Sequence, residues 1–256
     1  MDERRESRAK VRLFVAAALR ASASVPLSPD QAHYANKVMR LEPGDRVRLF
    51  NGRDGEWRAR LETLGRKGAA AIVEERSRAQ FPEPDIRLLF APLKKSALDF
   101  LIAKATELGV AELQPVSTRR TAAERVNLAR WRAQAIEAAE QCERLTVPDV
   151  RPLETLERAM GAWDGTRKLY VADETGGGVP VAEAFADTDA GIGPVAFLVG
   201  PEGGFAQSEL DALARLPFVT RVGLGPRILR AETAALVLLA CGQALAGDGR
   251  SPPPRD

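Results

Sequence analysis

The stretch LVGPEGGF occupies residues 198–205, and a second glycine and proline segment, LGPRILRAETA, follows at 224–234. Each one ends an apolar, strand-like run, VAFLVG (195–200) or FVTRVGL (218–224), and each leads into a segment with helical spacing. Two neighbouring β-α units of this kind place their glycine loops at the carboxyl edge of one parallel sheet, where α/β proteins bind ligands. The two stretches therefore predict a parallel α/β domain with a ligand site at that edge.

The same alternation of strands and helices extends back to residue 85, which favours a mostly parallel sheet covered by helices on both faces. Further strands are expected at DIRLLFAPL (85–93), ELQPVS (112–117) and RKLYVAD (167–173). Helices are expected over KKSALDFLIAKATEL, which should stop at Gly109, and over about 126–144, 181–186, 206–216 and 229–245.

The first 80 residues have a different pattern, with short strands and glycine turns that suggest a small β-barrel. VRLFVA (11–16) and RVRLF (46–50) are strand-like, as are WRARLETL and GAAAIVEE, and residues 28–40 have helical spacing behind the N-cap candidate Ser28. The segment AQFPEPD (79–85) lacks periodicity and marks a boundary. We expect domains at 1–80 and 81–250 and a disordered tail at 251–256.

The composition of the chain limits the kinds of site and partner that can be expected. Residues 1–80 carry 17 Lys and Arg against 11 Asp and Glu, an asymmetry that fits a nucleic-acid partner but also a solvated surface. Two cysteines and one histidine, His33, give no basis for a disulfide framework, a metal site or an ordinary Ser-His-Asp triad. The charged start MDERRESRAK and a longest uncharged run of 15 residues predict a cytoplasmic protein without a membrane span.

Phosphate-binding signatures do not explain the glycine loops. GIGPVA (191–196) precedes a strand instead of following one, and no P-loop lysine accompanies GPEGG. Bare backbone at Gly200, Gly203 and Gly204 suits a ligand that has a flat adenine ring and a net positive centre better than a polyphosphate. A plain strand-to-helix turn is the alternative. In the second segment Arg230 and Glu232 open a strongly apolar helix, where they could serve catalysis or form a structural ion pair.

The two segments, in this order, closely resemble the RsmE family of bacterial enzymes that methylate N3 of a uridine in 16S ribosomal RNA. The resemblance extends to KATELGV (104–110), AAEQCER (138–144), RLF (12–14) and HYANKVMR (33–40). It implies a PUA-like N-terminal β-barrel for RNA and a C-terminal SPOUT domain with a trefoil knot. It also implies S-adenosylmethionine as cofactor, a homodimer, no metal, and 16S rRNA or the small ribosomal subunit as substrate.

Carried over to this chain, the family's cofactor pocket has three walls. The resemblance assigns to it Leu198, Val199, Gly200, Pro201, Glu202 and Gly203, then Leu224 and Gly225, then Ile228, Leu229, Arg230, Glu232, Thr233 and Ala234.

The mechanism then needs groups that take a proton from uracil N3 and stabilise the resulting anion. Glu140, Gln141 and Arg144, expected on one face at the end of the long helix, are the catalytic candidates together with Arg230. Solvated polar residues at a helix end are the alternative for the first three. Arg12, Lys37 and Arg40 are the candidates for RNA phosphates.

Two other functions remain open at this point. One is a SPOUT-type methyltransferase that acts on a ribose 2′-hydroxyl, and the other is an RNA-binding ribosome-assembly factor with a vestigial cofactor site. The complete GPEGG and ILRAET segments favour an enzyme.

Overall fold

The chain, a computed structural model that describes residues 11–65, 68–122, 126–186 and 193–250, folds into two units. The N-terminal unit takes residues up to Pro82 together with Ala139–Val147, and the C-terminal unit takes Glu83–Ala138 and everything from Pro148 on. The expected division after residue 80 did not foresee that nine residues near 140 join the N-terminal unit. The expected tail, 251–256, lies outside the described residues.

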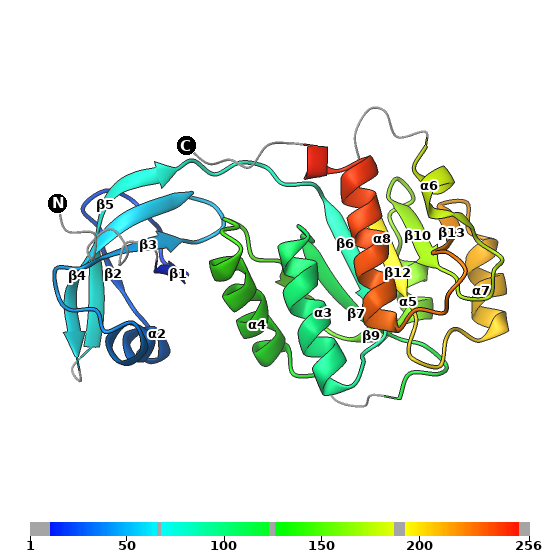
Figure 1. The fold of residues 1–256 in the computed structure, drawn as a ribbon, viewed down its shortest axis with the longest axis horizontal. Helices are drawn as coiled ribbons and strands as arrows, with labels where there is room; N and C mark the ends of the chain where they lie inside the picture. The colour runs from blue at the N-terminus through cyan, green and yellow to red at the C-terminus, as the bar shows by residue number, and fades with distance from the viewer. Residues whose placement is uncertain (1–10, 66–67, 123–125, 187–192, 251–256) are drawn as a thin grey trace. The chain divides into compact units, whose positions relative to one another are not determined.

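The N-terminal unit is built on a five-stranded sheet in the order β1-β3-β4-β5-β2 (Figure 1). β1 pairs with β3 in parallel, and the other neighbours are antiparallel. Alternating residues such as Val47, Leu49, Ala59 and Leu61 fill its core. The elements are β1 (Arg12–Phe14), β2 (Ser24–Pro26), α2 (Pro29–His33), η1 (Tyr34–Val38), β3 (Arg46–Phe50), β4 (Glu56–Gly65) and β5 (Gly68–Arg78).

The helical segment of this unit is shorter and less regular than its spacing suggests. Ser28 caps α2 as expected, because its hydroxyl accepts from the N–H of Gln31 while the Gln31 side chain accepts from the N–H of Ser28. The chain then widens into the π-helix η1, and Arg40 adopts a positive φ of 53°. π-Turns and left-handed non-glycine residues occur preferentially at functional sites.

The loop between β3 and β4 is held by Asp54. The N–H of Leu19 and the side-chain amide of Asn51 donate to its Oδ2, at 2.9 and 2.7 Å. These hydrogen bonds, the one from Leu19 first, lower the pKa of Asp54 below its usual 3.8.

The C-terminal unit contains a sheet in the order β11-β13-β10-β12-β6-β7-β8, with β9 added beside β7, and every pairing is parallel. This confirms the expected α/β class. Its strands are β6 (Ile86–Phe90), β7 (Glu112–Ser117), β8 (Asp149–Val150), β9 (Glu154–Thr155), β10 (Lys168–Ala172), β11 (Val179–Pro180), β12 (Val195–Val199) and β13 (Val219–Gly223). Its helices are α3 (Lys95–Glu107), α4 (Leu128–Gln141, whose last residues belong to the other unit), α5 (Leu156–Gly161), α6 (Val181–Ala184), α7 (Gln207–Ala214), α8 (Ala231–Leu245) and η2 (Asp248–Arg250).

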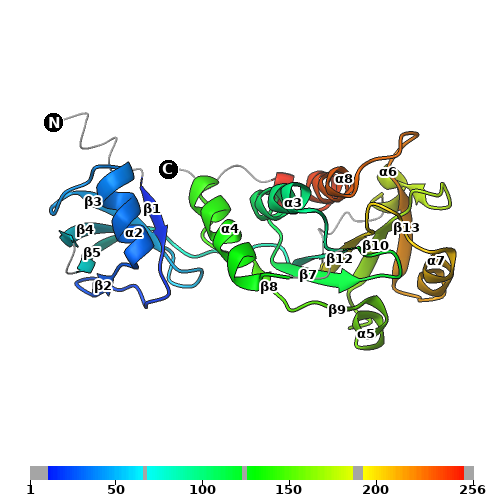
Figure 2. The ribbon, with the colours of Figure 1, turned by 90° about the horizontal axis from the view of Figure 1, so that it is seen from below.

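Helices cover both faces of the parallel sheet: α3 and α8 lie on one side, α5 and α7 on the other (Figure 2). Successive residues of β12 serve the two faces in turn, since Leu198 joins the cluster with α5 and α7 whereas the Phe197 ring lies against Gly242 of α8. A strand buried on both faces explains why VAFLV is apolar throughout. None of the helices in the described ranges has the length and apolar character needed to cross a membrane.

Candidate functional site

The carboxyl ends of three neighbouring strands enclose a cavity of about 1070 Å³ in the C-terminal unit. The loops that follow β10, β12 and β13 line it, and the first turns of α8 and α3 complete the walls. Neighbouring parallel strands leave their loops at the same edge, so the position of the cavity follows from the topology.

Glycines shape the loop after β12. Gly204 has a φ of +67°, and its N–H donates to the carbonyl of Pro201 at 2.9 Å, which closes a tight turn. Phe205 ends the turn and is buried beside Leu198 and Leu210, so it anchors the loop in the core. Gly225, in the loop after β13, also has a positive φ, +99°. These conformations leave backbone N–H and C=O groups uncovered by side chains along the cavity.

Carboxylates tie the cavity loops to one another. Glu202 accepts a long hydrogen bond, 3.4 Å, from the N–H of Lys94 at the start of α3. Glu174, in the loop after β10, accepts from the N–H of Phe205 at 3.2 Å. Asp173 is buried, accepts from the N–H and hydroxyl of Thr175, and lies 3.4 Å from the Arg221 guanidinium.

Most residues assigned to the cofactor by resemblance line this cavity. These are Val199, Gly200, Pro201, Glu202, Leu224, Gly225, Ile228, Leu229, Arg230, Glu232, Thr233 and Ala234. Leu198 is instead fully buried in the core, and the Gly203 carbonyl accepts from Arg120 at 3.0 Å. Their contact with a cofactor stays a prediction.

Sequence reasoning missed two parts of the cavity wall. One is the loop ADETG (172–176), and the other is the start of α3 with Lys94, Ser96, Ala97 and Phe100. Both follow strands that were expected, so the rule that places loops at the carboxyl edge of a parallel sheet could have identified them.

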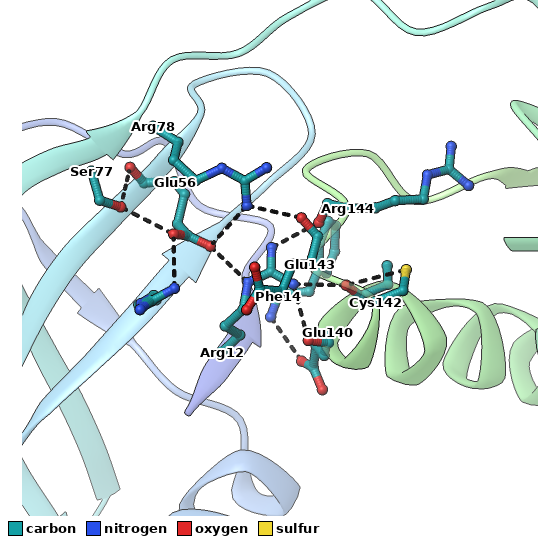
Figure 3. A network of polar contacts seen from close by, with 11 residues as sticks. Arg12, Phe14, Glu56, Ser77, Arg78, Glu140, Cys142, Glu143 and Arg144 are labelled. Atoms are coloured by element: carbon teal, nitrogen blue, oxygen red, sulfur yellow. Dashed lines mark hydrogen bonds and ion pairs between the residues drawn. The ribbon is translucent and has the colours of Figure 1, made fainter. Parts of the chain in front are cut away.

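The N-terminal unit holds a buried polar network around Glu56 (Figure 3). The Glu56 side chain is 1% exposed, and Arg12 donates from Nε to its Oε2 at 2.6 Å. Arg48 and Arg78 approach the same carboxylate at 3.7 and 3.9 Å, and Ser77 donates to it at 3.1 Å. One buried anion thus balances three guanidinium groups.

This network also fixes the segment 139–147. Arg12 donates to the carbonyls of Ala139, Glu140 and Arg144 at 2.7, 3.0 and 2.8 Å. Arg12 is only 5% exposed, which contradicts its expected role as a phosphate contact. Its sequence neighbours gave no sign of a buried partner, because Glu56 lies 44 residues further along the chain.

The expected catalytic group at the end of α4 is arranged differently from the prediction. The helix ends at Gln141, and Glu143 has a positive φ of 62°, so Arg144 does not continue the helical face. The carboxylate of Glu140 accepts from the N–H of Phe14 at 2.8 Å. Glu140, Gln141 and Arg144 belong to the N-terminal unit, whereas Arg230 lines the cavity of the C-terminal unit.

Lys37 and Arg40 flank an exposed apolar pair on η1 and the turn after it. Val38 is 60% exposed and Met39 36%. Ala35 on one side and Leu41 on the other are buried, and the N–H of Leu41 donates to the carbonyl of Ala35 at 2.9 Å. The four residues 37–40 therefore stand out from the unit as a fixed turn.

No cluster of three or more His, Cys, Asp or Glu side chains suited to a metal ion occurs within the part of the chain that the structure describes.

Comparison with known families defines the class of protein. An RNA methyltransferase domain matches residues 80–243, and an RNA methyltransferase PUA domain matches residues 27–74. The first match spans most of the parallel sheet and the loops that line the cavity, and the second spans β3, β4 and most of β5, so the fold is that of an RNA methyltransferase.

The chain belongs to the ribosomal RNA small subunit methyltransferase E family. It is 32% identical to the Rickettsia conorii protein of that name over 90% of this chain and 93% of the relative. It is 34% identical to the Synechocystis protein, over 90% and 76%.

Solved structures agree with this assignment. The Neisseria gonorrhoeae ribosomal RNA small subunit methyltransferase E, bound to S-adenosylmethionine, has a TM-score of 0.81 and 30% identity, covering 93% of this chain and 98% of its own. A putative methyltransferase from Legionella pneumophila, in complex with the same cofactor, has a TM-score of 0.83 and 28% identity over the same shares.

Proposed function

We propose that this protein transfers the methyl group of S-adenosylmethionine to N3 of a uridine in 16S ribosomal RNA, as a homodimer in the cytoplasm. The observation that carries the proposal is the three-loop cavity, whose walls contain most of GPEGG and all of ILRAET, the segments by which the chain resembles the family. Its relatives bear the name of small-subunit rRNA methyltransferases.

The residues of the cavity fit this cofactor. The glycines of the loops after β12 and β13 bring bare backbone to the wall, which suits the edge of an adenine ring. Glu202 and Glu232 lie on the walls and complement a cationic sulfonium and ammonium, while a polyphosphate would face unfavourable charges. The cofactor supplies an electrophilic methyl group. The protein therefore has to bind the cofactor, orient it against the base, and accept the proton that leaves N3.

Among the catalytic candidates, Arg230 is a residue that lines the cavity. It is the N-cap of α8, its side chain is exposed, and no ion pair to it occurs among the described residues. We propose that its guanidinium stabilises the negative charge that spreads over O2, N3 and O4 when uracil loses the N3 proton. An exposed arginine at the cavity mouth can reach a base that has left its stack.

We also propose that Gln141 and Arg144 lie near the substrate. The proposed role of the residues at the end of α4 is tested by replacing Glu140. Its hydrogen bond to Phe14 predicts that Glu140→Ala lowers the stability of the N-terminal unit. A folded variant that binds the methyl donor normally but fails in single turnover would restore Glu140 to the catalytic group.

The turn 37–40 is the proposed RNA contact of the N-terminal unit. Lys37 and Arg40 supply cations for phosphates, and Val38 and Met39 supply an apolar surface for an unstacked base. Replacing both cations by alanine should weaken binding to all RNA sequences and reduce the salt slope by roughly 0.7 to 0.9 per lost phosphate contact. A matched control is Arg46→Ala with Arg58→Ala, since these exposed arginines already pair with Glu74 and Glu75.

The activity is tested by incubating the protein with S-adenosylmethionine and small ribosomal subunits that lack the modification. Digestion to nucleosides and mass spectrometry should then detect 3-methyluridine. A product methylated on ribose would replace the proposal by 2′-hydroxyl methylation, and RNA binding with no methylated nucleoside would favour an assembly factor. Arg230→Ala should bind the donor while losing turnover, and a variant with wild-type turnover would remove Arg230 from the mechanism.

A further inference from the structure

The loop Gly200–Phe205 is held in place by side chains from three other segments of the C-terminal unit. Glu202 bonds to the start of α3, and Arg120, in the loop after β7, donates to the carbonyl of Gly203. Glu174 accepts from the N–H of Phe205 at 3.2 Å. The loop forms one wall of the cavity, and the shape of this wall depends on these partners outside the loop.

Of these three side chains, Glu174 is the one that packs against Gly204 of the loop. A Cβ atom added at Gly204 would overlap its Oε1, so the carboxylate fills the space that a side chain would otherwise take. The N–H that it accepts belongs to Phe205, the residue at which the loop enters the core. Glu174 therefore fixes the junction between the glycine turn and its buried anchor, Phe205.

We infer that Glu174 is a positioning residue for the methyl donor: its carboxylate oxygen, as a hydrogen-bond acceptor, holds the β12 loop in the shape that binds the cofactor. This inference rests on the proposed location of the donor in the cavity. The shape of the loop depends on the acceptor oxygen of Glu174 and does not depend on its negative charge. Loss of the acceptor leaves the loop free to populate other shapes, so only a fraction of molecules is competent to bind.

The test compares Glu174→Ala with Glu174→Gln by calorimetric titration of S-adenosylmethionine, without RNA. A hydrogen bond of ordinary net strength corresponds to a rise in Kd of about 2- to 12-fold for Glu174→Ala. Glu174→Gln keeps an acceptor oxygen and should bind within about twofold of the wild type. With saturating donor, kcat of the alanine variant should return to within about twofold, because the chemical step does not use Glu174.

Two further variants separate the possible failures. Glu157→Ala removes an exposed carboxylate on α5 that is not part of the cavity wall, and its Kd should not change. Thr233→Trp places a large ring on the cavity wall and should abolish donor binding.

Equal losses in Glu174→Gln and Glu174→Ala would overturn the inference, because the charge would then be the important property. An unchanged Kd for Glu174→Ala, or a comparable loss for Glu157→Ala, would overturn it as well. If Thr233→Trp binds the donor normally, the proposed location of the cofactor is itself wrong.

Discussion

Gly204→Ala is the sharpest perturbation of the proposed donor site. Gly204 has a φ of +67°, a conformation that costs an L-residue roughly 1 to 2 kcal/mol. The added Cβ would also overlap Oε1 of Glu174 and push the carboxylate off the N–H of Phe205, a hydrogen bond worth about 0.5 to 1.5 kcal/mol. The combined penalty is roughly 1.5 to 3.5 kcal/mol.

This penalty should be measured as lost affinity. The loop lies at the edge of the sheet and can relax in the free protein, but the donor must restore its shape on binding. Titration of S-adenosylmethionine should therefore give a Kd raised by about 10- to 300-fold, while the thermal unfolding midpoint changes little.

The adjacent glycine provides the control. Gly203 does not have a positive φ, and a Cβ there would meet the side chain of Arg120 at an ordinary 3.7 Å, so Gly203→Ala should bind almost normally. The double variant Gly204→Ala, Glu174→Ala removes the clash and should be less impaired than the sum of the single effects. A Kd for Gly204→Ala within twofold of wild type, or strict additivity in the double variant, would refute the reasoning.

Three further predictions concern stability and are read from denaturation curves. Glu56→Ala leaves three guanidinium groups without their common anion and should lower the free energy of unfolding by about 3 to 5 kcal/mol; a loss under about 1 kcal/mol would contradict the network. Gly242→Ala puts a Cβ 2.6 Å from the Phe197 ring, and overpacking should cost about 1 to 3 kcal/mol unless α8 shifts freely. Asp54 has a lowered pKa in the folded state, so its contribution is present above pH 3.8 and lost as the pH falls through the folded value; Asp54→Asn should flatten this acid limb, and an unchanged limb would argue against it.

The sequence predicts best those strands that have clear turn residues on both sides. RVRLF and ELQPVS become β3 and β7 with the expected ends, because turn residues enclose a short apolar or alternating run. Strands of two or three residues, such as β2, β8 and β9, are too short to contain a period and were missed. They form because a neighbouring strand offers backbone groups, which is tertiary information.

Part of the candidate site could likewise be predicted from the sequence, and part could not. The glycine loops could be located from the sequence, because a glycine's freedom is a property of the residue and the sheet edge follows from chain order. The roles of arginine and glutamate could not, because they depend on partners far along the chain. Arg12 and Arg40 look alike in the sequence, yet one lies against buried Glu56 and the other stands on an exposed turn.

The role of Glu202 becomes clear only from its hydrogen-bond partner. A carboxylate inside a glycine turn argues against phosphate, and sequence alone leaves it either solvated or in contact with a ligand. In the structure it accepts from the N–H of Lys94, the N-cap of α3, whose own side chain makes no capping bond. A helix N-terminus favours an anion, so the loop after β12 stabilises the start of α3 while it lines the cavity. The charge that seems unsuited to a nucleotide loop thereby joins two walls of one site.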